Sequence, residues 1–199
     1  MVQKQGTKLL KGEVRIIGGK WRQRKLSVPT VEGLRPTPDR VRETLFNWLQ
    51  FILPGAKVLD LFSGTGILAF EALSRGASQV TLVEQSKLVC KQLQDSATKL
   101  EVASEAYTII NQDAFAWLEK IEQRSPDEAF DLVFLDPPYH QGYIEKILPI
   151  LFGHNSFLKQ NGLIYLESEK ALSADLLPPT IEVLKSKKAG MVHYFLLRI

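Results

Sequence analysis

The chain has 199 residues, of which 45% are hydrophobic and 24% charged, and this balance fits one soluble domain with at most a small appendage. No apolar run approaches the roughly 18 residues of a membrane helix and the start lacks the apolar core of a signal peptide, so we expect a cytoplasmic protein without membrane contact. A single cysteine, Cys90, excludes an internal disulfide, and three scattered histidines without ligand spacing lead us to expect no metal site.

Positive charge is concentrated at the N-terminus. Residues 1–42 contain eleven Lys or Arg and three acidic residues, a net charge of +8, whereas the remaining 157 residues have a net charge of −5. A cationic segment on a mildly acidic body favours a polyanionic partner, because phosphate contacts supply most of the non-specific affinity for nucleic acids. A merely solvated basic tail would have the same composition.

The first predicted elements are two short strands, VRIIGG at 14–19 and RKLSV at 24–28, which form a hairpin around KWRQ. Trp21 and Arg22 would lie at its tip. An exposed Trp21 among cations would stack on a base, whereas a buried one would pack on the body of the protein, and the sequence leaves both open. We expect residues 1–36 to form this basic arm and residues 37–199 to form the main domain.

A helix is predicted next, in TPDRVRETLFNWLQFI at 37–52. Thr37 suits the N-cap and Pro38 the first helical position. Apolar residues recur at helical spacing and predict a buried face (Val41, Leu45, Trp48, Leu49, Ile52). Arg40 and Arg42 lie close in sequence to the basic arm.

From residue 57 onward, strands and helices are predicted to alternate. The strands are expected at 57–61, 79–84, 107–111, 130–136 and 162–168, and helices within 67–77, 86–100 and 114–123. Two further strands around KKAG, within 181–199, would form an antiparallel hairpin. Such alternation gives parallel strands with helices on both faces, so we predict an α/β, doubly wound Rossmann-like sheet closed by a C-terminal hairpin.

In such a sheet, ligands bind at the carboxyl ends of the strands. The first strand ends in DLFSGTG at 60–66, where Gly64 and Gly66 allow a tight turn close to a ligand. Glu84 ends the second strand, where it would accept hydrogen bonds from ribose hydroxyls. Asp113 follows the third, where it would accept one from an adenine amino group. A nicotinamide dinucleotide and S-adenosylmethionine both fit these features.

Electrostatics favours S-adenosylmethionine over the dinucleotide. A dinucleotide would place its pyrophosphate beside Asp60, which would repel it, and Ala69 stands in place of the usual third glycine. The ammonium and sulfonium groups of S-adenosylmethionine would instead be attracted by the Asp60 carboxylate. We therefore expect S-adenosylmethionine as cofactor and S-adenosylhomocysteine as product.

The fourth strand ends in Asp136-Pro137-Pro138-Tyr139. The two prolines fix two φ angles and remove two N–H donors, which leaves oxygen acceptors with little conformational freedom. Such acceptors suit an amino group whose lone pair is delocalised, since hydrogen bonds to the Asp136 carboxylate and the Pro137 carbonyl favour a tetrahedral nitrogen in the transition state. Tyr139 would stack on the ring that carries the amino group. A simple strand terminator is the plainer interpretation of the prolines.

The sequence resembles the RsmD family of bacterial small-subunit ribosomal RNA methyltransferases over nearly the whole chain, through RIIGGKWRQRKLSVP, GLRPTPDRVRETLFNWL, VLDLFSGTG, EALSRGA and FDLVFLDPPY. The resemblance implies the seven-stranded S-adenosylmethionine-dependent methyltransferase fold and methylation of the exocyclic N2 of one guanine in 16S ribosomal RNA. Ser96-Ala97 replaces a frequent Asn-Leu of the family, and Ser63-Gly64-Thr65-Gly66 replaces Ala-Gly-Ser-Gly. Neither departure removes a group that the chemistry needs.

The expected site residues follow from both arguments. Catalytic residues are expected at Asp136, Pro137, Pro138 and Tyr139. Cofactor contacts are expected from Asp60, Phe62, Ser63, Gly64, Gly66, Glu84, Gln85, Asp113 and Ala114. RNA contacts are expected from Arg15, Lys20, Trp21, Arg22, Arg24, Lys25, Arg35, Arg40 and Arg42. The expected partner of a monomeric enzyme is 16S ribosomal RNA, either free or within the small ribosomal subunit.

Three alternatives use some of the same features. A DNA adenine-N6 methyltransferase shares the Asp-Pro-Pro-Tyr chemistry, but such enzymes commonly carry a separate target-recognition region, for which little of this chain is left. A protein glutamine methyltransferase needs no cationic hairpin and usually has Asn at the position of Asp136. A non-catalytic RNA-binding protein would not need the acidic cofactor positions together with Asp136 to Tyr139.

Overall fold

The computed structural model describes residues 12–28, 39–121, 128–139, 141–153 and 157–199. The strands are β1 (Gly12–Arg15), β2 (Lys25–Val28), β3 (Lys57–Asp60), β4 (Gln79–Glu84), β5 (Tyr107–Asn111), β6 (Phe130–Leu135), β7 (Leu158–Ser168), β8 (Glu182–Ala189) and β9 (Val192–Arg198). The α-helices are α1 (Asp39–Trp48), α2 (Ile67–Ser74), α3 (Lys87–Lys99), α4 (Ala114–Lys120) and α5 (Tyr143–Gly153). Short 3₁₀ turns lie at Gly19–Trp21, Ser104–Ala106 and Ala174–Leu176.

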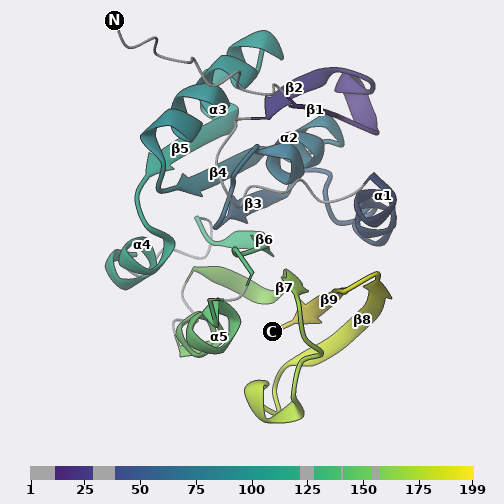
Figure 1. Cartoon of the computed structure of the whole chain (residues 1–199), viewed down its shortest axis with the longest axis vertical. Helices are drawn as coiled ribbons and strands as arrows, with labels where there is room; N and C mark the ends of the chain where they lie inside the picture. Colours follow the sequence, from purple (N-terminus) through teal and green to yellow (C-terminus); the bar gives the residue numbers. More distant parts are fainter. Residues whose placement is uncertain (1–11, 29–38, 122–127, 140, 154–156) are drawn as a thin grey trace, which may run out of the picture.

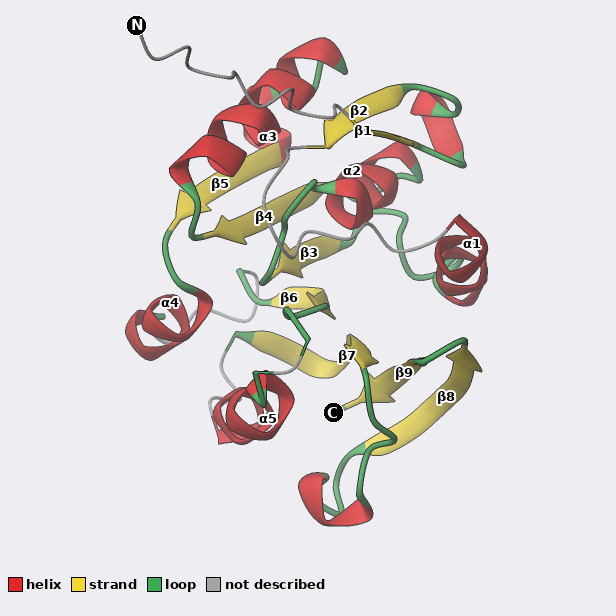
Figure 2. Cartoon of the chain, viewed as in Figure 1, coloured by secondary structure: helices red, strands yellow, loops and turns green. Residues whose placement is uncertain are grey.

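Seven of the described strands form one sheet, in the order β5-β4-β3-β6-β7-β9-β8 (Figure 2). Neighbours from β5 to β7 are parallel, whereas β7 and β9 and then β9 and β8 pair antiparallel. The chain order reverses between β3 and β6, so their carboxyl ends meet at the switch point where open α/β sheets bind ligands. The predicted doubly wound sheet with a C-terminal hairpin is thus confirmed.

Helices cover both faces of this sheet, because alternate residues of its central strands are apolar on both sides (Figure 1). On one face, α1, α2 and α3 pack with Val58, Leu132 and Tyr165 in one hydrophobic cluster. On the other face, α4 and α5 pack with Leu59 and Val133 in a second cluster. Because alternate side chains of a strand point to opposite faces, each side chain at a strand end lies either on the side of α1, α2 and α3 or on the side of α4 and α5.

Helix α5 was not individually predicted from the sequence. Pro149 lies inside it and is disfavoured there, because proline lacks the N–H that a helix interior needs. Ile144, Ile147, Leu148 and Leu151 nevertheless recur at helical spacing and are all buried. Burial of this apolar face outweighs the local cost of the proline.

The N-terminal hairpin of β1 and β2 is part of the core. Its strands pair antiparallel from Gly12 opposite Val28 to Arg15 opposite Lys25, so the predicted hairpin is present, with its first strand at 12–15 rather than 14–19. Ile16, Trp21 and Leu26 belong to the same hydrophobic cluster as α1 and α2. The domain boundary expected at residue 36 lies outside the described residues and stays a prediction.

Close approach to α2 fixes the hairpin at its turn. The backbone N–H of Trp21 donates to the Ser74 hydroxyl at 2.9 Å, and that hydroxyl donates to the Gly18 carbonyl at 2.6 Å. Gly19 has a φ of +74°, and a Cβ atom there would lie 1.8 Å from the Ser74 carbonyl oxygen. Gly19 is therefore required by contact with α2 as well as by its positive φ.

Two residues expected to contact RNA are instead buried. Trp21 retains 7% of its exposure, so its indole packs on the body and the base-stacking interpretation is wrong. Arg42 is fully buried and forms ion pairs with Asp39 and, at 3.6 Å, with Glu71, while donating to the Arg15 carbonyl at 3.0 Å. Their surroundings explain both corrections, because each side chain is enclosed by the contact between the hairpin and the α1–α2 layer.

Candidate active site

The turn after β3 surrounds a buried carboxylate. Asp60 retains 2% of its exposure, and the backbone N–H groups of Phe62 and Ala69 hydrogen-bond to it. Burial, opposed by these bonds and assisted by the nearby charge of Glu84, raises the pKa of Asp60 to about 7. Asp60 therefore lies beneath the turn and stabilises it by accepting hydrogen bonds from its N–H groups.

Glu84, at the end of β4, joins two loops of the site. Its Oε2 accepts from the Gly64 N–H at 3.1 Å, and its Oε1 accepts from the Ser86 N–H at 2.7 Å. Gly64 and Gly66 have φ angles of 48° and 73°, which are favourable for glycine and bring the turn back over β4. The half-buried carboxylate is thereby held at the mouth of the turn with a fixed orientation.

The other residues expected to contact cofactor lie around the same turn. Ser63 is buried, with its hydroxyl donating to the Asp60 carbonyl at 2.9 Å, and exposed Gln85 follows Glu84. Asp113 is the N-cap of α4, and its Oδ1 accepts from the N–H groups of Phe115 and Ala116 at 3.0 Å each. Buried Ala114 begins that helix.

An aromatic group closes one side of this region. The ring of Phe62, which follows β3, stacks on Tyr143 of α5 at 5.8 Å, and Phe115 of α4 meets Tyr143 edge-on at 5.2 Å. Phe62 was expected at the site, but Tyr143 and Phe115 were not. Tyr143 and Phe115 come near Phe62 because of how α4 and α5 pack, and the periodicity of the sequence does not predict that packing.

The chemistry of these groups fits S-adenosylmethionine. Three carboxylates, those of Asp60, Glu84 and Asp113, lie at the ends of β3 and β4 and before α4, in a sheet whose β5, β4 and β3 are adjacent. Carboxylates complement an ammonium group, ribose hydroxyls and an adenine amino group, whereas they would repel a pyrophosphate. The donor and acceptor set therefore suits a cationic nucleoside better than a dinucleotide.

Asp136 to Tyr139 follow β6 directly beside the β3 turn. Parallel pairing places Asp60 opposite Phe134, and the Leu61 N–H donates to the Phe134 carbonyl at 3.2 Å. Asp136 is half-buried and Pro137 buried, whereas Pro138 and Tyr139 are exposed. An aromatic ring that can stack is thus present next to a carboxylate at the strand switch point.

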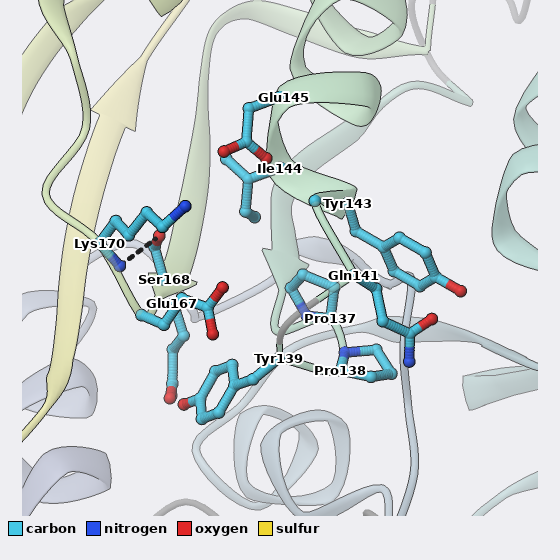
Figure 3. Close-up of a pocket in the computed structure, with 12 residues that line it drawn as sticks. Pro137, Pro138, Tyr139, Gln141, Tyr143, Ile144, Glu145, Glu167, Ser168 and Lys170 are labelled. Atoms are coloured by element: carbon cyan, nitrogen blue, oxygen red, sulfur yellow. Dashed lines mark hydrogen bonds between the residues drawn. The ribbon is translucent and has the colours of Figure 1, made fainter.

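A pocket opens beside this segment, between the loop after β6 and the end of β7. Figure 3 shows Pro137 and Pro138 on one side and Glu167, Ser168 and Lys170 on the other, with the ring of Tyr139 below Glu167. Glu167 was not singled out from the sequence. One signal was present, because the strand 162–168 ends in Glu-Ser much as the strand 79–84 ends in an acid.

The remaining cations expected to contact RNA are exposed on the hairpin and on α1. They are Arg15, Lys20, Arg22, Arg24, Lys25 and Arg40. Arg15 forms an ion pair with Asp39 at 3.0 Å, and Lys25 forms one with Glu13 at 2.8 Å. Arg35 lies outside the described residues.

Among the described segments of the chain, no helix is both long and apolar enough to span a membrane. The same segments contain no group of three or more His, Cys, Asp or Glu side chains that could hold a metal ion.

Comparison with known proteins gives consistent matches along the chain. A family model described as "Conserved hypothetical protein 95" matches residues 14–198. Proteins named ribosomal RNA small subunit methyltransferase D are similar: that of Haemophilus influenzae is 47% identical over 92% of this chain and 93% of its own, and that of Escherichia coli K12 is 41% identical over 92% and 88%. The solved structure of a putative methyltransferase from Escherichia coli superposes with a TM-score of 0.81, at 38% identity, over 94% of this chain and 98% of that one.

Proposed function

The chain belongs to the RsmD family of methyltransferases, and from this premise we propose that it transfers a methyl group from S-adenosylmethionine to the exocyclic N2 of a guanine in 16S ribosomal RNA. The observation that carries the proposal is the position of Asp136-Pro137-Pro138-Tyr139 beside the glycine turn of β3, where amino group and methyl donor would meet. The names of the similar proteins support ribosomal RNA of the small subunit as substrate.

The residues of the turn would bind the cofactor. Glu84 would accept hydrogen bonds from the ribose hydroxyls, and Asp113 would accept one from the adenine amino group. The ammonium and sulfonium groups of the bound cofactor would favour the ionised form of Asp60, which would in turn attract them. When bound, S-adenosylmethionine supplies an electrophilic methyl group.

Asp136 and Pro137 would act on the amino group of the base. The nitrogen of guanine N2 is a poor nucleophile because its lone pair is delocalised into the ring. Hydrogen bonds to the Asp136 carboxylate and the Pro137 carbonyl would favour the tetrahedral nitrogen that attacks the methyl carbon, and Asp136 would take the proton that the nitrogen loses. Exposed Tyr139 would hold the flipped base by stacking.

The exposed cations of the hairpin and α1 would bind phosphates of the RNA. Arg22 and Arg24 support this role, because both are exposed at the turn of the hairpin. Their charge would steer the RNA and raise its affinity without reading its sequence. Base selection would then depend on the pocket beside Tyr139.

Mass spectrometry of ribosomal RNA nucleosides tests the proposal. Deletion of the gene should abolish N2-methylguanosine at one position of 16S ribosomal RNA, and the purified protein with S-adenosylmethionine should restore it. The acceptor is compared as free RNA and as assembled small subunits. Unchanged ribosomal RNA nucleosides after deletion would contradict the proposal. Methyl transfer by the purified protein to adenine in DNA would favour the alternative substrate.

A further inference from the structure

The row of side chains across β6 and β7 ends in two neighbouring carboxylates. Phe134 pairs with Tyr165 and Leu135 with Leu166, so continuation of this parallel pairing brings Asp136 opposite Glu167. Phe134 and Tyr165 belong to the same hydrophobic cluster, and alternation directs Asp136 and Glu167 to that same face. Adjacent strands are about 5 Å apart, which is close enough for both carboxylates to reach one planar ligand.

Glu167 is almost completely buried, and a hydrogen bond fixes the orientation of its carboxylate. It retains 2% of its exposure and lines the pocket with Pro137 and Tyr139 (Figure 3). It also accepts a hydrogen bond from the Tyr165 hydroxyl at 2.7 Å. Burial, followed by the charges of Glu167 and Asp136 among others, raises the pKa of Tyr165 well above its usual value. Both carboxylates therefore lie near the same buried hydroxyl.

A buried carboxylate at this position needs a reason. An apolar side chain would fill the end of β7 without the cost of removing a charge from water. The Tyr165 hydroxyl offsets part of that cost and also fixes the orientation of the carboxylate. These features are expected of a group that recognises a polar ligand in the adjoining pocket.

The Watson–Crick edge of guanine offers a matching pair of donors, since N1–H and the N2 amino group are adjacent. Adenine has an acceptor at N1, and so does 2-aminopurine, which still carries the amino group at C2. A carboxylate facing N1 would therefore favour guanine and disfavour 2-aminopurine by opposing its N1 lone pair. Bases flipped into enzyme pockets are commonly recognised along this edge.

We propose that Glu167 selects guanine, by accepting a hydrogen bond from N1–H while Asp136 holds the adjacent N2 amino group. This inference rests on the proposed function, because it assigns a residue to recognition of the base that would be methylated. Tyr165 is then a positioning residue, which acts through Glu167.

The test changes the hydrogen-bonding group at N1 of the base and, separately, the side chain at position 167 that faces it. The target nucleotide, first located by the nucleoside analysis above, is introduced by ligation as guanine or as 2-aminopurine into the RNA or particle that accepts methyl groups. Methyl transfer to each is measured as kcat/KM for the wild type, Glu167→Gln and, as a control, Glu182→Gln. Glu182 is exposed on β8 and is not among the residues that line the pocket, and the control removes the same charge.

The wild type should prefer guanine over 2-aminopurine by roughly 100-fold. Glu167→Gln should reduce this preference at least tenfold, because the amide N–H group can donate to the N1 lone pair of 2-aminopurine, whereas the neutral amide oxygen is a weaker acceptor than the carboxylate for the N1–H of guanine. Glu182→Gln should keep the wild-type preference. Comparison of the two substrates within one variant cancels losses through poorer folding, which affect both equally.

Two results would overturn the inference without touching the proposed function. One is a wild type that methylates both bases at similar rates, which is informative even if Glu167→Gln does not fold. The other is an unchanged preference in Glu167→Gln. Absence of any guanine methylation by the wild type would instead contradict the proposed function itself.

Discussion

Arg40 and Arg42 provide a sharp test, because they lie two residues apart on α1 with opposite surroundings. Arg40 is exposed, whereas Arg42 is fully buried against Glu71, Asp39 and the Arg15 carbonyl. We expect Arg42→Met to lower the free energy of unfolding by about 3–5 kcal/mol, as when one partner of a buried ion pair is removed. Arg40→Met should change it by less than about 0.5 kcal/mol.

The magnitude for Arg42 follows from what its loss leaves behind. Glu71 is itself fully buried and also accepts from the Ile17 N–H and from Arg75 Nε, at 2.7 Å each. Without Arg42 its carboxylate keeps those two donors but loses a buried cation, and the Arg15 carbonyl loses a donor.

Urea denaturation followed by circular dichroism measures the free energy of unfolding of each variant. RNA affinity is measured separately at several salt concentrations. Arg40→Met should flatten the log–log salt dependence by roughly 0.7 if Arg40 contacts one phosphate, and Arg42→Met should leave that slope unchanged. The reasoning fails if Arg42→Met is as stable as Arg40→Met, or if Arg42→Met alters the salt slope while remaining folded.

Four further outcomes are expected. Asp136→Ala should leave S-adenosylmethionine affinity nearly unchanged but raise the barrier to methyl transfer by roughly 2.7–4 kcal/mol, and near-normal turnover in a kinetic assay would contradict its catalytic role. Glu84→Ala and Asp113→Asn should each weaken S-adenosylmethionine in calorimetry by about 1.5–3 kcal/mol, with Asn chosen because it preserves the α4 N-cap; unchanged affinity in both would remove these assignments. Joint replacement of Arg22, Arg24 and Lys25 by Ala should flatten the salt dependence of RNA binding by about two units, and a wild-type slope would show these cations to be merely solvated. Because burial raises the Asp60 pKa to about 7 from 3.8, the folded protein binds more protons than the unfolded one between these values, so its free energy of unfolding should fall by up to about 4 kcal/mol as pH rises through this window. The fall in the free energy of unfolding, measured by urea titration at several pH values, should be smaller in Asp60→Asn than in the wild type. An equal pH dependence in the two proteins would refute the raised pKa of Asp60.

The strands of the sheet were predictable because their patterns are local. Apolar runs bounded by turn residues identified β3, β4 and β5 within a residue of their ends. The beginning of β7 at Leu158 was missed, since Asn161 with a φ of 64° and Gly162 interrupt the pattern. Strand continuity there depends on pairing with β6, which is a non-local interaction.

The candidate site was predictable to the extent that it lies at strand ends. Acidic residues after apolar runs pointed to Glu84 and Asp136, and the same pattern in GLIYLES would have pointed to Glu167. Burial of Trp21 and Arg42 was not predictable, because it depends on contact between the hairpin and α2, which is distant in sequence. Charge counted along a chain does not distinguish a solvated arginine from one enclosed by the fold.

Helix α2 acts as a short rigid spacer between the hairpin and the glycine turn. Its eight residues span about 12 Å, beginning directly after Gly66 and ending at Ser74, whose hydroxyl bonds to the hairpin. An RNA backbone held by the hairpin would therefore meet the β3 turn at a fixed separation. Under the proposed function, only guanines that the folded RNA presents at this distance from the bound phosphates would reach the β3 turn.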